Sequence, residues 1–98
     1  MYIPKGKTKQ TEDKKMWHEG TIGIPVTGTK ESKIAHYWVK AYEEPSEEYG
    51  INGGKISKLS IKIDGEWVAN YDRGWDIEPD PENQVVQVAY YILLEQYN

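Results

Sequence analysis

An alternation of polar and apolar residues before an Asp64-Gly65 pair, with a second run of strand-forming residues after it, constrains the fold of this 98-residue chain more than any other feature. Residues 56–63 follow the period-two pattern of a half-buried β-strand. Asp-Gly between two such runs is among the strongest short signals for a β-hairpin. Residues 56–71 are therefore predicted to form a hairpin with one apolar face. The apolar members of its first strand are Leu59, Ile61 and Ile63, and the polar members are Lys58, Ser60 and Lys62.

Two pairings of this hairpin are compatible with the sequence. A two-residue turn at Asp64-Gly65 pairs Lys62 with Trp67, but it sets polar side chains of the second strand beside the apolar face. A three-residue loop of residues 63–65 pairs Lys62 with Glu66 instead, and it sets the apolar residues of the two strands against each other. The second pairing is favoured because it matches polar residues with polar and apolar with apolar.

Two further strands are predicted before the hairpin. Residues 34–43 are rich in β-branched and aromatic residues, and the face with Ala35 and Val39 is predicted to be the core face. Residues 16–26 form the other strand, in which Pro25 marks a sheet edge or a strand end. A connection of about a dozen residues, 43–54, then leads to the hairpin. A loop that long in a small domain is usually functional or mobile.

The last predicted element is a C-terminal helix whose first residue is Pro81. Asp80 acts as its N-cap and Pro81 takes the first helical position. The apolar residues that follow cover one broad face, which must be buried, and the sheet is the available partner. The predicted fold is therefore α+β, a four-stranded, mainly antiparallel sheet with one C-terminal helix packed on one face. Residues 16–98 are predicted to form this single domain, since a chain of this length has room for one core.

Charge is distributed unevenly along the chain. Residues 1–40 hold eight lysines and four acids, a net charge of +4, while residues 41–98 hold four cations and twelve acids, a net charge of −8, which together give −4. Residues 1–15 are lysine-rich and poor in branched apolar residues, and we expect them to be flexible. A basic segment before an acidic body is consistent with an anion-seeking tail or with a solvated acidic surface.

Few side chains in the sequence are suited to catalysis. The chain has no Cys, so a disulfide framework, a thiolate metal site and a cysteine nucleophile are excluded. His18 and His36 are far apart and lack a paired ligand spacing, and no GxSxG motif is present. The acids between Asp72 and Asp80 do not have the spacing of a Ca²⁺ loop. We therefore expect no catalytic residues, no metal site and no cofactor, and predict that the protein is not an enzyme.

The sequence also lacks the apolar segments of membrane and exported proteins. It has no apolar run near the ~20 residues that span a bilayer, and its N-terminus lacks the apolar stretch of a signal peptide. A cytoplasmic protein with no membrane partner is expected.

The segment of residues 71–76 holds the single arginine of a chain with eleven lysines. Arg73 is flanked there by two aspartates and two aromatic rings. An arginine kept once, where lysine is used elsewhere, suggests a planar bidentate or stacked partner that an ammonium cannot replace. The structural alternative is an ion pair of Arg73 with Asp72, Asp76 or a glutamate of residues 43–48, which would pin the exit of the last strand.

A second candidate segment is the glycine-rich run of residues 50–55. Consecutive backbone N–H groups near glycines can bind an anion, and Lys55 would add a point charge. The alternative is that Gly53-Gly54 only turns the chain. Residues 50–55 enter the third strand and residues 71–76 leave its antiparallel partner, so both segments are expected at the same end of the sheet. The predicted ligand-binding residues are Asn52, Lys55, Tyr71, Arg73 and Trp75.

Three stretches of the chain together resemble a known family. YWVK at residues 37–40, EPSEEYGINGGKISKL at residues 44–59 and YDRGWD at residues 71–76 resemble a small uncharacterised domain found in phages and prophages of Firmicutes. The lysine-rich start lies outside the resemblance. The resemblance implies a viral or mobile-element context and no known activity, and it assigns no functional residues.

Three functions are compatible with these features. The leading hypothesis is a non-enzymatic phage or prophage accessory protein that binds a host component, such as a host protein, and inhibits a host defence system. The first alternative is a small-ligand module that sequesters a nucleotide-like anion with Lys55 and Arg73. The second is nucleic-acid binding through the basic N-terminal segment. All twelve aromatic rings are Tyr or Trp, and with an exposed strand near Pro25 they also allow a homodimer.

Overall fold

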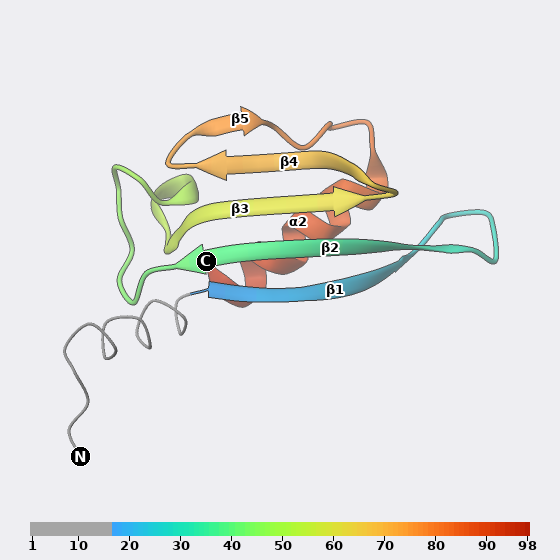
Figure 1. Cartoon of the computed structure of the whole chain (residues 1–98), viewed down its shortest axis with the longest axis horizontal. Helices are drawn as coiled ribbons and strands as arrows, with labels where there is room; N and C mark the ends of the chain where they lie inside the picture. The colour runs from blue at the N-terminus through green and yellow to red at the C-terminus, as the bar shows by residue number, and fades with distance from the viewer. Residues whose placement is uncertain (1–16) are drawn as a thin grey trace, which may run out of the picture.

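The computed structural model describes residues 17–98. Helix α2 lies against one face of a single antiparallel sheet, and in residues 17–98 no other helix covers the opposite face (Figure 1). The predicted flexibility of residues 1–15 concerns residues outside this range. The sheet runs in chain order through β1 (Trp17–Pro25), β2 (Ser32–Ala41), β3 (Ile56–Ile63), β4 (Glu66–Asp72) and β5 (Trp75–Ile77), and the helical elements are η1 (Ile51–Gly53) and α2 (Gln84–Tyr97).

The α+β architecture with an antiparallel sheet and one C-terminal helix is confirmed, but the predicted number of four strands is wrong. Residues 75–77 form a fifth strand, which pairs with β4 through Tyr71 and Trp75 and through Asn70 and Ile77. Three residues are too few to show an alternating pattern, so the sequence carried no signal for β5. β1 and β5 are the edges of the sheet, and β1 ends at Pro25.

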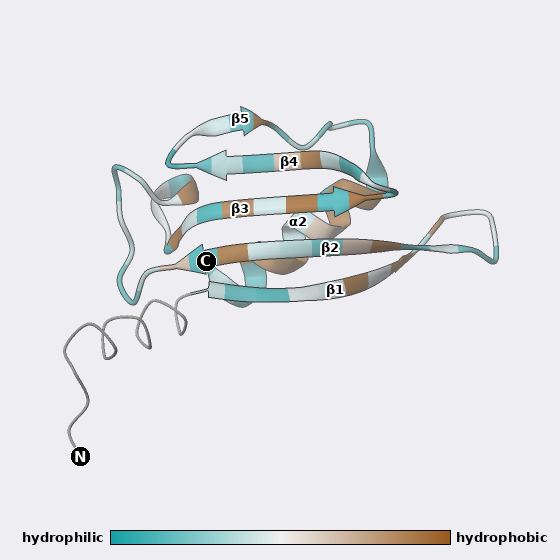
Figure 2. Cartoon of the chain, viewed as in Figure 1, coloured by the Kyte–Doolittle hydropathy of each residue, from teal (hydrophilic) through white to brown (hydrophobic). Residues whose placement is uncertain are grey.

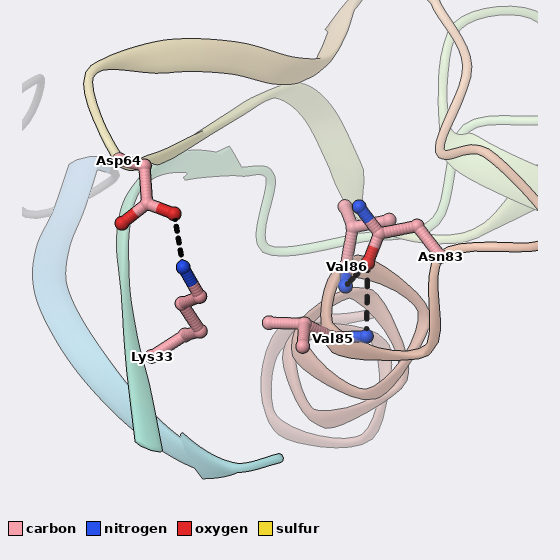
Figure 3. Close-up of polar contacts among 5 residues, drawn as sticks. All are labelled: Lys33, Asp64, Asn83, Val85 and Val86. Carbon is pink, nitrogen blue, oxygen red and sulfur yellow. Dashed lines mark hydrogen bonds and ion pairs between the residues drawn. The ribbon is translucent and has the colours of Figure 1, made fainter. Parts of the chain in front are cut away.

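The turn between β3 and β4 differs from the favoured prediction. Asp64 and Gly65 have φ values of 54° and 80°, the left-handed conformations of a two-residue type I′ turn, and this turn pairs Lys62 with Trp67. The three-residue loop of residues 63–65 is therefore wrong. The turn is also held to β2, because Lys33 forms an ion pair with Asp64 (Figure 3).

A β-bulge resolves the conflict that made the two-residue turn look unfavourable. The register shifts between Ile61 and Lys62, and beyond the shift Ile61 faces Ala69 and Leu59 faces Tyr71. One additional β4 residue is accommodated there, which returns the apolar side chains of both strands to one face. The tight turn and the matched apolar face therefore occur together.

The core lies between the inner face of the sheet and α2. Ala35 and Val39 are fully buried, so the predicted core face of β2 is confirmed. Hydrophobic and hydrophilic residues alternate along β3, as expected for a strand with one buried face (Figure 2). The fully buried apolar residues of the sheet are Ala35, Val39, Ile56, Leu59, Ile61 and Ala69, and those of the helix are Val86, Ala89 and Leu93.

Helix α2 begins at Gln84, not at Pro81 as predicted. Its N-cap is Asn83, whose Oδ1 accepts hydrogen bonds from the N–H groups of Val85 at 3.0 Å and Val86 at 3.3 Å (Figure 3). Asp80 instead caps a turn that precedes the helix. Proline suits the second position of a turn as well as the first position of a helix, so the sequence pattern did not separate the two. No helix within residues 17–98 is long and apolar enough to span a membrane.

Candidate functional site

The β2–β3 connection and the β4–β5 turn meet at one end of the sheet (Figure 1). One hydrogen bond joins the β4–β5 turn to β3 there, and another joins β4 to the β2–β3 connection. The backbone N–H of Arg73 donates to the carbonyl oxygen of Ser57 at 3.1 Å, and the hydroxyl of Tyr71 donates to the carbonyl oxygen of Tyr49 at 3.0 Å. The convergence expected from the order of the strands is therefore present. We use the term rim for the side chains that these two segments present at this end, namely Tyr49, Asn52, Lys55 and Arg73.

Arg73 is exposed and has a left-handed backbone conformation. Its φ is 55°, a value that is uncommon for residues other than Gly, Asn and Asp. Hydrogen bonds on both sides fix this conformation, from Arg73 N–H to Ser57 and from Asp72 N–H to the carbonyl oxygen of Gly74 at 2.9 Å. The guanidinium carbon lies 5.7 Å from the centroid of the Tyr49 ring, within the range of a cation–π contact.

The predicted structural alternative for Arg73 is only partly realised. Its Nε lies 3.7 Å from Asp72 Oδ1, and the same oxygen lies 3.9 Å from Lys58 Nζ. Among residues 17–98, no ion pair joins Arg73 to Asp76 or to the glutamates of residues 43–48. The Arg73 side chain keeps 56% of its surface exposed, so the donor fork is accessible to an anionic partner.

Two of the predicted ligand-binding rings are part of the packed interior. Tyr71 is only 7% exposed. Trp75 packs edge-on against Tyr71, with ring centroids 4.9 Å apart, and against Tyr90 at 5.5 Å. Burial also raises the pKa of Tyr90 above its ordinary value. Of these rings, Tyr71 contacts the rim through its hydrogen bond to the Tyr49 carbonyl, and the ring beside Arg73 belongs to Tyr49.

Two glycines of the glycine-rich run, Gly50 and Gly54, lie where a larger residue would not fit. A Cβ on Gly50 would lie 1.8 Å from the carbonyl oxygen of Gly54, and a Cβ on Gly54 would lie 2.4 Å from the Asn98 side chain. Asn98 fastens this loop to the end of α2, because its Oδ1 accepts from Ile56 N–H at 2.9 Å and its Nδ2 donates to the Ile51 carbonyl at 3.0 Å. The loop is therefore attached to the rest of the fold by side-chain hydrogen bonds from Asn98.

The backbone amides of this loop are largely engaged within it. The N–H groups of Gly50, Gly53 and Gly54 donate to the carbonyl oxygens of Ser46, Gly50 and Ile51. An anion nest needs consecutive free N–H groups. Binding of an anion at the rim would therefore depend on the side chains of Lys55 and Arg73. No hydrogen bond or ion pair in the described part of the chain joins Arg73 to Asn52 or Lys55.

The two histidines lie apart in the fold as they do in the sequence. His18 stacks on Tyr97 with ring centroids 4.5 Å apart, and His36 Nε2 lies 2.9 Å from Glu19 Oε2. Within residues 17–98, no group of three or more His, Cys, Asp or Glu side chains is placed to hold a metal ion.

Comparison with known protein families assigns the chain to one of them. The family profile of a domain of unknown function, DUF7678, matches residues 16–98. The chain belongs to the DUF7678 family. No curated protein and no solved structure matches it. The DUF7678 match spans all five strands and α2, so it includes every residue of the rim.

Sequence reasoning missed one rim residue of this DUF7678 domain. Tyr49 is 43% exposed, and its ring is the aromatic partner of the Arg73 guanidinium. It lies in the long connection already marked as a functional or mobile loop, directly before Gly50. Its role depends on which way the loop folds over β4, and no local pattern encodes that contact.

The DUF7678 domain also has an open groove of about 900 Å³ at the other end of α2. Its walls come from the end of β1 with the turn after it and from the residues that lead into α2. The lining includes the carboxylates of Asp80 and Glu82 and no cationic side chain. None of the predicted site residues lies there.

Proposed function

We propose that this DUF7678 domain is a non-enzymatic binding protein of a phage or prophage. In this proposal the rim attaches to an acidic group on a host protein in the host cytoplasm and blocks that protein, with a defence factor as the expected target. The phage context comes from the sequence resemblance, and the binding role comes from the rim.

The observation that carries the binding role is the conformation of Arg73. A non-glycine residue in the left-handed region costs of order 1–3 kcal/mol, and such strain is concentrated at functional sites. Here the strained residue is the only arginine of the chain, and its side chain is more than half exposed. Neither the core nor a buried ion pair requires it. The turn accounts for the conformation, and a partner that needs a planar, bidentate cation would account for an arginine at a position that suits glycine or asparagine better.

A protein is the favoured partner because of the neighbour that Arg73 has. Tyr and Arg are enriched among the residues that dominate binding energy at protein interfaces. Tyr49 and Arg73 lie side by side at the rim, and the hydrogen bond from Tyr71 fixes the backbone of Tyr49. Anchoring of the loop backbone before binding reduces the ordering cost when a partner docks.

A nucleotide-like anion is the second candidate, favoured by the same pair. The Tyr49 ring can stack on a planar base while Arg73 and Lys55 meet its phosphates. The engaged amides of the glycine-rich run weaken this candidate, since they supply no nest for a phosphate. Nucleic-acid binding through residues 1–15 stays a prediction, as does the homodimer.

Affinity capture from host lysate with three forms of the full chain tests the proposal. Wild type is compared with Arg73→Lys, which keeps the charge but loses the fork, and with Lys30→Gln, which alters a charge in the turn between β1 and β2. A host protein retained by wild type and by Lys30→Gln is then purified and titrated by calorimetry. We expect Arg73→Lys to weaken its binding by 10-fold or more.

A nucleotide panel titrated by calorimetry against the same three forms tests the second candidate. Retention of a nucleotide that Arg73→Lys abolishes would replace the host protein with a small anion as the partner. Equal binding of any partner by wild type and Arg73→Lys, or retention of neither class of ligand, would refute the role assigned to the rim.

A further inference from the structure

The sheet face opposite α2 carries a set of aromatic rings and lysines that are separate from the rim. Side chains along a strand alternate between the two faces. Because Ala35 and Val39 of β2 point into the core, His36, Trp38 and Lys40 project from the opposite side. We call this side the open face. Figure 1 views the sheet from this side, with α2 behind it.

Cross-strand pairing arranges the open face in three rows. Paired residues of neighbouring strands lie side by side on the same face, so each row crosses the sheet from β1 to β4. The first row is Trp17, Lys40, Lys58 and Asp72, the second is Glu19, Trp38, Ser60 and Asn70, and the third is Thr21, His36, Lys62 and Trp67.

The rings of these rows are in contact with one another and with the lysines. His36 stacks on Trp38 with centroids 4.1 Å apart, and Trp38 meets Trp67 at 5.3 Å. The Nζ of Lys62 lies 5.0 Å from the Trp67 ring, and Lys40 Nζ lies 5.8 Å from a Trp17 ring. Trp67 is 50% exposed and Trp17 is 42% exposed. Large aromatic surface is thus held in fixed positions and left open to solvent.

We propose that the open face binds single-stranded nucleic acid. Unpaired bases would stack on Trp67, on the His36–Trp38 pair and on Trp17, while Lys40, Lys58 and Lys62 would meet the phosphates. Such a platform suits a single strand because its bases can turn their flat faces onto the rings, whereas the bases of a duplex are stacked on each other. The assignment does not depend on the role of the rim.

Charge complementarity supports a polyanionic occupant. The three rows hold three lysines and two carboxylates, a net charge of +1, while residues 17–98 as a whole hold seven cations and fourteen acids, a net charge of −7. The rows of the open face therefore carry a net positive charge on an acidic domain, although Lys58 lies 3.9 Å from Asp72 Oδ1. A nucleic acid would be repelled by the other surfaces and directed to this one.

The composition of the rows also argues against an apolar protein partner. The three rows contain no aliphatic side chain, and between their rings they present lysines, hydroxyls and an amide. One exposed aliphatic residue, Ile34, lies on the same face beyond the third row. Ser60 Oγ and Asn70 Oδ1, 3.2 Å apart, form a polar strip at the centre that can hydrogen-bond to base edges. In sequence, a segment with five lysines and two acids, residues 1–15, precedes Trp17 at the end of the first row.

Fluorescence anisotropy of the full chain with labelled dT15, U15 and a 15-base-pair duplex tests the proposal at low salt. We expect both single strands to bind and the duplex to bind at least 10-fold more weakly. Trp67→Ala should weaken binding roughly 5- to 150-fold, the effect of losing one base stack, while Trp67→Tyr should retain most of the affinity. Tyr91→Ala, at a residue of α2 that is 61% exposed, is the matched control and should bind as wild type does.

The salt dependence provides a second measurement that does not rely on aromatic variants. Lys62→Gln should lower the slope of log K against log salt by about 0.7, the value for one lost phosphate contact with a single strand, whereas Lys30→Gln should leave it unchanged. A variant with the five lysines of residues 1–15 changed to Gln separates the tail from the face. Failure of both single strands to bind, preference for the duplex, or binding that only the tail variant reduces would each overturn the assignment.

Discussion

The hydroxyl of Tyr71 donates a hydrogen bond to the backbone carbonyl oxygen of Tyr49 at 3.0 Å. Tyr71 is a buried residue of β4, and Tyr49 is an exposed residue of the β2–β3 connection. The bond therefore fastens the long connection to the core at the residue whose ring lies beside Arg73. The position of the rim is set by core packing and is not left to the loop alone.

Tyr71→Phe should loosen the rim while leaving the core filled. The ring stays, but the Tyr49 carbonyl loses its partner, and we expect the free energy of unfolding to fall by about 0.5–1.5 kcal/mol. Urea denaturation measures this loss, and amide exchange at Gly50 should become faster because its hydrogen bond to Ser46 lies in the same loop. Tyr91→Phe removes an exposed hydroxyl and should have no effect on either measurement. Equal stability of both variants would mean that the bond does not anchor the loop.

Gly50→Ala should be among the most damaging single-methyl changes in the domain. The added Cβ would lie 1.8 Å from the Gly54 carbonyl oxygen, a backbone atom that cannot move without opening the loop. We expect a loss of roughly 3 kcal/mol or more, in the range of severe overpacking. Gly23→Ala is the matched control, since its Cβ would meet nothing closer than the Ile34 side chain at 3.8 Å. Thermal denaturation of both variants measures the difference in their stability. Equal stability of Gly50→Ala and Gly23→Ala would mean that the loop relaxes around the added methyl group.

The sequence was sufficient to predict elements whose side chains alternate or that carry strong turn residues. The Ala35 and Val39 face of β2, the α+β architecture and the convergence of two segments at one end of the sheet all follow from strand periodicity and strand order. The bulge beside Lys62 was not predictable in this way. A bulge is chosen by the combined demands of the Asp64-Gly65 turn and of core packing, and each demand alone favours a different register.

The location of the candidate site could be predicted from the sequence, but only some of its residues could. The solitary Arg73 drew attention to the correct turn, but its aromatic neighbour is Tyr49, from a loop about two dozen residues away, and Tyr71 and Trp75 pack inward. The three rows of the open face also depend on exact register across four strands. A one-residue slip would send Trp38 and its neighbours into the core, so such a surface becomes evident only when the pairing is known.

The stability of Arg73 variants should depend on how well the new residue tolerates the left-handed conformation. Asn tolerates the left-handed region better than other non-glycine residues, whereas Ala does not, so Arg73→Asn should be more stable than Arg73→Ala by about 1 kcal/mol. Both variants remove the guanidinium, and both should lose the binding assigned to the rim. Urea denaturation compares the stabilities. If the Asn variant is no more stable than the Ala variant, the φ of 55° carries no strain, and the case that Arg73 is kept for function loses its main support.

Stability should fall at alkaline pH through Tyr97, a partly buried tyrosine at the end of α2. Burial, and then the hydrogen bond to Tyr37, raise the pKa of Tyr97 to about 12, whereas an unfolded tyrosine titrates near 10. The folded state then holds a proton that the unfolded state releases, so this contribution is complete below about pH 10 and is lost as the pH rises towards 12. The pKa values of Tyr90 and Lys33 are also raised, by burial and by the hydrogen bond to Asp64 respectively, and they act in the same direction.

Tyr97→Phe isolates the contribution of that one hydroxyl. At pH 8 the variant should lose about 1 kcal/mol or less, because the 3.3 Å contact with the Tyr37 hydroxyl is long and only partly buried. Between pH 10 and pH 12 its free energy of unfolding should decline less steeply than that of wild type, since one linked titration is gone. Urea denaturation at a series of pH values measures both slopes, and Tyr91→Phe, which removes an exposed hydroxyl, should follow wild type. Parallel slopes for wild type and Tyr97→Phe would show that the Tyr97 hydroxyl does not titrate differently in the folded and unfolded states.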